Sequence, residues 1–162
     1  MRSIGIDLGT TYSCVMHHPA SGLDVVIETS DGKDLTPSVA YFSSNGDVIV
    51  GDRAKERLAD DAENLVVGIK RQMGKHFPLE FNGNEYTPEG ISGIILRRLA
   101  QDAAAHFGVP VSDLRSVITV PAYFGVAERE ATFSAAEIAG LTCLELLPEP
   151  VAAAYAYGLS EG

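Results

Sequence analysis

The residues with the clearest chemical potential lie at positions 4–15, which read IGIDLGTTYSCV. Alternating apolar and small or polar residues predict two strands, joined by a turn at Gly9, Thr10 and Thr11. Gly9 lets a ligand approach the backbone closely, and the N–H groups and threonine hydroxyls can surround phosphate oxygens. Asp7 would repel that phosphate unless a cation lay between them, and Mg²⁺ takes few protein ligands. The segment predicts a magnesium and phosphate site, with an ordinary hairpin carrying Asp at its turn as the alternative.

Length and composition place the chain among globular proteins. Its 162 residues, 46% hydrophobic and 21% charged, suffice for one domain or part of a larger one. A net charge of −10 argues against nucleic-acid or anionic-membrane partners. Nucleotide binding stays open, because local donors and a magnesium ion outweigh a diffuse field at contact distance. No apolar run has membrane-spanning length and no signal-peptide pattern opens the chain, so we expect a cytoplasmic protein.

The cysteines and histidines show no pattern that indicates a metal or redox site. Cys14 and Cys143 fall in predicted strands without ligand or redox-pair spacing, so we interpret them as small core residues in a reducing compartment. The histidines lack ligand spacing and are predicted to be exposed or incidental; they are His17, His18, His76 and His106.

The order of predicted elements favours an α/β fold. Hairpin-linked strands come first and helix–strand crossovers follow, which predicts a mixed sheet whose first strands are antiparallel and later ones parallel, flanked by helices. After the first hairpin, strands are predicted at 24–28, 38–42, 48–50, 117–120 and 142–147, with a small hairpin at 81–86. Helices are predicted at 52–62, 65–73, 88–107, 127–139 and 151–157.

Several spaced motifs make the sequence resemble a known family. They are IGIDLGTTYSCV at the start, IKR at 69–71, VITVPAYF at 117–124, IAGL at 138–141 and LLPEPVAAAYAYGL at 146–159. In this order they are similar to the N-terminal ATPase domain of the 70-kDa heat-shock chaperones. That resemblance implies an actin-like, ribonuclease H-like ATPase fold, of which this chain is the first lobe.

The resemblance also implies a division of that lobe. Residues 1–35 and 110–162 would form its core subdomain, with residues 36–109 as a smaller inserted α+β subdomain. The second phosphate loop, the adenosine-binding segment and the peptide-binding domain are expected only after residue 162. The lobe alone is therefore expected to fold but to be inactive.

The family's ligands are ATP or ADP with Mg²⁺, and the matching residues acquire roles from it. Asp7 would hold the hydrated magnesium, with phosphate contacts expected from Gly9, Thr10, Thr11 and Tyr12. Lys70 would act on the γ-phosphate and the attacking water, although most helical lysines are only solvated surface. Its neighbour Arg71 is interpreted as structural.

Glu149 precedes Pro150 at a predicted helix start. The simpler interpretation is an acid favoured by the helix dipole. The resemblance assigns it to the catalytic site, where an ionised carboxylate orients a water but is a weak base. We therefore expect positioning rather than proton abstraction.

Two further residues match a relay between the nucleotide and the peptide-binding domain. They are Pro121, otherwise a strand terminator, and Arg129, otherwise a surface residue. The parent protein would bind exposed apolar peptides through its missing domain, together with J-domain and nucleotide-exchange cochaperones. It would thereby assist protein folding, including under stress.

The sequence departs from the family pattern at a few places. The segment between Lys70 and Thr87 is short, so the inserted subdomain is expected to be reduced. Gly125-Val126 replaces the usual Asn-Asp and weakens the cap of the next helix. Pro148 and Val151 replace Asn and Thr beside Glu149, which leaves the hydrogen bonding around that carboxylate open.

A filament-forming relative of actin is the main alternative. Such proteins share the DLGT hairpin and the Glu-Pro-x-Ala-Ala-Ala helix. VPAYF, IKR and the inserted subdomain favour the chaperone, and a sugar kinase is disfavoured because its own motifs do not follow the first turn.

Overall fold

The main layer of the molecule is a six-stranded sheet. The computed structural model describes residues 2–148, so the helix predicted at 151–157 lies outside it. The strands follow the order β11-β10-β1-β2-β3, with β4 also paired to β2. They are β1 (Arg2–Asp7), β2 (Tyr12–His17), β3 (Val25–Val26), β4 (Thr36–Pro37), β10 (Leu114–Val120) and β11 (Thr142–Pro148).

The directions of these strands confirm the predicted mixed sheet. β1 pairs antiparallel with β2 and parallel with β10, in register from Arg2 opposite Leu114 to Asp7 opposite Thr119. β11 then pairs parallel with β10. β10 begins earlier than predicted, because Arg115 and Ser116 interrupt the apolar run but still pair with β1. The carboxyl ends of β1, β10 and β11 therefore lie along one edge.

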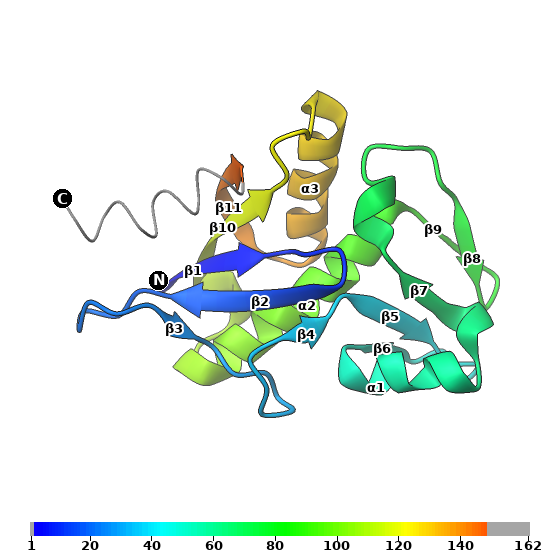
Figure 1. The fold of residues 1–162 in the computed structure, drawn as a ribbon, viewed down its shortest axis with the longest axis horizontal. Coiled ribbons are helices and arrows are strands. Elements are labelled where there is room, and N and C mark those ends of the chain that lie inside the picture. Colours follow the sequence, from blue (N-terminus) through cyan, green and yellow to red (C-terminus); the bar gives the residue numbers. More distant parts are fainter. Residues whose placement is uncertain (1, 149–162) are drawn as a thin grey trace.

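A smaller unit lies beside the main sheet (Figure 1). Its three-stranded sheet has the order β6-β5-β7. These strands are β5 (Val39–Phe42), β6 (Val48–Val50) and β7 (Leu65–Val67). The hairpin of β8 (Leu79–Phe81) and β9 (Asn84–Tyr86) confirms the one predicted at 81–86, with Phe81 stacked on Phe42 at 4.2 Å between ring centroids.

Two predicted helices of this unit are wrong in type or length. The helix predicted at 52–62 is the short α1 (Asp52–Lys55), continued by 3₁₀ turns η1 (Glu56–Ala59) and η2 (Ala62–Asn64). The helix predicted at 65–73 is strand β7 followed by the 3₁₀ turn η3 (Ile69–Gln72). Pairing of β7 with β5 outweighs the local pattern, and Gly68 with φ of 64° interrupts any helix there.

Two long helices, by contrast, follow the prediction closely. In α2 (Pro88–Phe107) the Thr87 hydroxyl accepts from the Gly90 N–H at 3.1 Å, and Gly108 with φ of 67° ends the helix. In α3 (Val126–Ile138) the N-cap Gly125 offers no side-chain acceptor, as expected. Its own N–H nevertheless donates to Glu128 Oε2 at 3.0 Å, so half of a capping box remains.

The core lies between the main sheet and these helices, and it extends into the smaller unit. Helix α2 contacts both, since it packs on α3, on β2 and on β5. The 3₁₀ turn η4 (Val111–Asp113) leads from α2 into β10. The largest completely buried side chains include Ile6, Phe42, Met73, Ile91, Ile95, Leu99, Leu114 and Ile118.

Helices α2 and α3 approach each other most closely at Gly93. A Cβ there would lie 2.6 Å from Ile138 Cγ2 and 3.1 Å from the Ala135 carbonyl oxygen. We predict that Gly93→Ala lowers the free energy of unfolding by about 1–2 kcal/mol, because the clash exceeds the gain in helix propensity. Gly90→Ala in the same helix is the control and should cost less, because its Cβ would meet only the Thr87 hydroxyl, at 3.2 Å. Urea unfolding measures both, and a stabilised Gly93→Ala would contradict this packing.

Candidate functional site

Asp7 ends β1 at the carboxyl edge of the main sheet. Directly opposite, Thr119 of β10 donates a hydrogen bond from Oγ1 to Asp7 Oδ1 at 3.1 Å. The Asp7 side chain is otherwise exposed. The hydroxyl therefore fixes one oxygen of an exposed carboxylate and leaves the other free to accept. Sequence reasoning missed Thr119, although its place in the predicted strand 117–120 made it a candidate.

Two serine hydroxyls form a hydrogen-bonded chain with the turn after Asp7. The Gly9 N–H donates to Ser13 Oγ at 3.2 Å, and Ser13 Oγ lies 2.7 Å from Ser38 Oγ. The Ser38 N–H donates to the Thr11 carbonyl at 2.9 Å. Residues 9–13 are thereby tied to the entry of the smaller unit.

The structure gives Gly9 a role that the sequence did not reveal. A Cβ on Gly9 would lie 2.0 Å from the Tyr12 carbonyl oxygen, and φ of Gly9 is not positive. The hairpin's own backbone therefore excludes a side chain here, whether or not a ligand also approaches. A side chain at Gly9 is therefore expected to disturb the hairpin itself.

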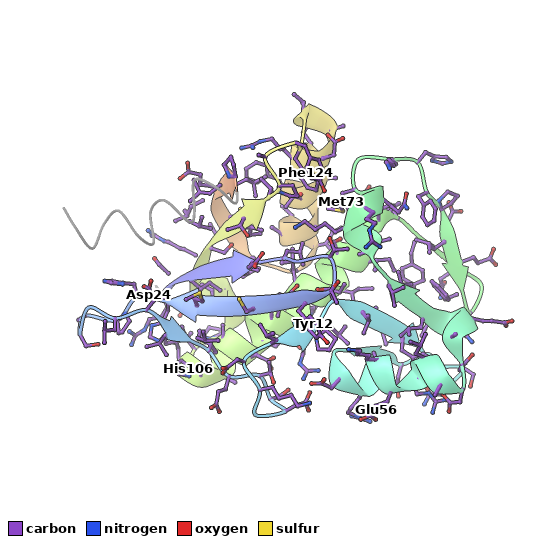
Figure 2. The ribbon with its side chains drawn as sticks, viewed as in Figure 1. Tyr12, Asp24, Glu56, Met73, His106 and Phe124 are labelled. Atoms are coloured by element: carbon purple, nitrogen blue, oxygen red, sulfur yellow. The ribbon has the colours of Figure 1, made fainter. Side chains whose placement is uncertain are left out.

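A pocket of about 250 Å³ opens beside the turn. Its lining includes Thr10, Thr11, Lys55, Gly68 and residues of β5 and β7. Tyr12 stands at the start of β2 (Figure 2) and accepts a hydrogen bond from Lys55 Nζ at 2.7 Å. Lys55, which the sequence did not single out, thus brings a positive charge next to the predicted phosphate contacts.

Lys70 lies in η3 and is only 8% exposed. This turn packs against α2, where the Ser92 hydroxyl donates to Met73 Sδ at 3.2 Å. Lysine is rarely buried this deeply, so the alternative that Lys70 is only a solvated surface residue does not hold. Arg71 is exposed and lines the pocket next to Thr10 and Thr11.

The two residues matched to the interdomain relay are both at least partly buried. Pro121 is buried directly after β10. Arg129 of α3 is half-buried and donates from Nη2 to the Leu146 carbonyl of β11 at 3.2 Å, so it is not a plain surface residue. Pro148 ends β11 opposite Val120. Glu149 and Val151 lie outside the described residues.

The donor set fits a hard cation at Asp7. Within residues 2–148, no group of three or more His, Cys, Asp and Glu side chains could hold a metal ion. A single carboxylate beside hydroxyl groups suits Mg²⁺, which keeps most of its waters.

At the far end of the sheet, the rings of His17 and His106 lie 5.4 Å apart, a proximity the sequence did not predict. In residues 2–148, no helix combines the length and hydropathy needed to cross a membrane.

Comparison with protein families identifies the chain. The model of the family described as "Hsp70 protein" matches residues 3–81 and 77–162. The chain belongs to the Hsp70 protein family. The actin-like ATPase fold of Hsp70 proteins is consistent with the mixed sheet and its flanking helices. The resemblance found in the sequence is thereby confirmed.

Asp7 also acts on a neighbouring thiol. Cys14 of β2 pairs with Asp7 across the hairpin, and both cysteines are half-buried rather than core residues. Burial raises the pKa of the Cys14 thiol, and the Asp7 charge raises it further. Burial also raises the pKa of Cys143, which has no contribution from Asp7.

We predict that Asp7→Asn accelerates alkylation of Cys14. A raised pKa lowers the thiolate fraction at a given pH, so removing the Asp7 charge lowers this pKa and increases the fraction of reactive thiolate. Iodoacetamide labelling at pH 8, followed by mass spectrometry, measures both cysteines, and Cys143 is the internal control. Equal rates at Cys14 with and without the Asp7 charge would contradict the arrangement.

Proposed function

We propose that this chain provides one wall of the Mg-ATP site in the ATPase domain of an Hsp70-type chaperone. The full-length chaperone would hydrolyse ATP to ADP and phosphate. The proposal rests on the Asp7–Thr119 pair, which places a fixed carboxylate at the edge of the sheet next to the Gly9–Thr11 turn. Family membership supports a chaperone ATPase in general, and the residue roles are our assignment.

Each residue at this edge takes a distinct task. Asp7, held by Thr119, accepts from waters of a hydrated magnesium. The Gly9–Tyr12 segment gives N–H and hydroxyl contacts to phosphate oxygens, and the Gly9 N–H must exchange its present bond to Ser13 to do so. Bound magnesium would neutralise charge on the β- and γ-phosphates.

Lys70 and Glu149 complete the proposed catalytic set. The Lys70 ammonium would stabilise the charge that develops on the γ-phosphoryl group. Because Lys70 is buried, its side chain has little freedom to move away from that position. Glu149, directly after β11, would orient the attacking water. Phosphoryl transfer asks mainly for such positioning and charge stabilisation.

We also propose the division into a core subdomain of residues 1–35 and 110–162 and an inserted subdomain of residues 36–109. The separate sheets support it. Helix α2 falls in the insertion by sequence, yet it shares the core of the main sheet. In the parent, Pro121 and Arg129 would carry the nucleotide state toward a peptide-binding domain that holds apolar segments, under the control of J-domain and exchange cochaperones.

We predict that Lys70→Met in the intact parent lowers single-turnover ATP hydrolysis by about 10²-fold while ATP affinity changes little, because the charge acts mainly on the transition state. Methionine keeps a buried apolar stem, and circular dichroism checks the fold. Lys75→Met, at an exposed position nearby, is the control. Near-normal hydrolysis by the Lys70 variant would remove Lys70 from the mechanism.

We predict that a polypeptide of residues 1–162 alone binds Mg-ATP only at millimolar concentration. One wall leaves the phosphates competing with water, and a loss of about 4 kcal/mol in contacts weakens affinity about a thousandfold. Calorimetric titration at high protein concentration measures this. Micromolar binding with turnover would show that these residues hold a complete site.

A further inference from the structure

A second pocket lies between β6 and α2, away from Asp7. Its volume is about 420 Å³. Apolar residues from both elements line it, namely Val48, Ile49 and Ile94, together with three arginines. Val48 is 38% exposed, so part of this apolar surface faces solvent.

The charge around this pocket is opposite to that of the chain as a whole. The net charge is −10, yet no acidic side chain of residues 2–148 lines the pocket, whereas Arg53, Arg97 and Arg98 do. Arg98 is neutralised by Asp31 at 3.2 Å and Asp102 at 3.3 Å.

The other two arginines have no partner among residues 2–148. Within residues 2–148, no hydrogen bond, ion pair or ring contact engages the side chain of Arg53 or Arg97. Two like charges bordering one pocket repel each other, and carboxylates bound between them would relieve that repulsion.

Strand β6 adds a backbone edge to this surface. It pairs only with β5 in the described part of the chain. The Ser43 N–H donates to the Asp47 carbonyl at 2.9 Å, so the next pair, Phe42 and Val48, is a non-hydrogen-bonded one. The Val48 N–H and C=O therefore point away from β5. The same alternation directs the Val50 carbonyl outward, where Arg98 Nη1 donates to it at 3.1 Å.

We propose that this pocket binds an extended acidic segment of a partner protein, in which apolar residues alternate with Asp or Glu. One face of such a strand would place its apolar side chains on Val48 and Ile94, because neighbouring residues of a strand face opposite sides of the sheet and Ile49 packs with Tyr41 and Ala54. Its carboxylates would reach Arg53 and Arg97, and its backbone would pair with Val48. The inference does not depend on the nucleotide site.

A fluorescent octapeptide of alternating glutamate and valine is the probe, titrated with the 162-residue chain and followed by anisotropy. Arg97→Gln should weaken binding about fivefold, the effect of one partly exposed charged contact. Lys75→Gln removes an equal charge outside the pocket and should leave binding nearly unchanged. Arg97→Lys should fall between wild type and Arg97→Gln, because lysine keeps the charge but not the planar fork. Amide shifts in NMR should centre on residues 48–50 and 94–97.

Several results would overturn the proposal. They are absence of binding, equal losses in Arg97→Gln and Lys75→Gln, or equal binding of a lysine–valine octapeptide. Displacement of the probe by equimolar inorganic phosphate would show a simple anion site, and would equally reject a peptide partner.

Discussion

The parallel pairing of β1 with β10 is the interaction on which the rest of this structure depends. It joins segments more than a hundred residues apart and runs in register from Arg2 and Leu114 to Asp7 and Thr119. Because parallel strands end at the same edge, this register alone places the Thr119 hydroxyl on the Asp7 carboxylate. A slip of one residue would turn these side chains to the other face of the sheet and separate them. The candidate site is thus a consequence of strand register before it is a matter of loop shape.

Helix α2 carries the second constraint, because it connects two sheets that have no strand in common. Its inner face packs against the main sheet, and its N-terminal half packs against η3. The burial of Lys70 therefore depends on the position of α2. Gly93 allows the close approach of α2 and α3, and Arg129 of α3 donates a hydrogen bond to the Leu146 carbonyl of β11. Elements far from the Gly9–Thr11 turn therefore determine where Lys70 and the carboxyl end of β11 can lie.

Sequence reasoning predicted the mixed sheet, the first hairpin and both long helices, because each has strong local signals such as the Thr87 cap and Gly108. It mistook residues 65–73 for a helix, since Leu65–Val67 becomes a strand only through pairing with β5. It could not anticipate the burial of Lys70 or the bond from Lys55 to Tyr12, which are tertiary contacts without a local pattern. The sequence points to Gly9 for the approach of a ligand, whereas in the structure the nearest obstacle to a side chain there is the Tyr12 carbonyl oxygen. The family motifs supplied what local patterns could not, because several motifs in a fixed order and spacing identify a family whereas single residues do not.

Paramagnetic broadening by Mn²⁺ in the presence of ADP tests the central claim most directly. Mn²⁺ takes the same hard oxygen ligands as Mg²⁺ and broadens nearby amide signals in NMR spectra. The account predicts that substoichiometric Mn²⁺-ADP first broadens the amides of residues 7–11 and 119–120, and that Asp7→Asn removes this effect. Broadening that begins at other acidic residues and persists in Asp7→Asn would contradict a metal and phosphate site at the end of β1.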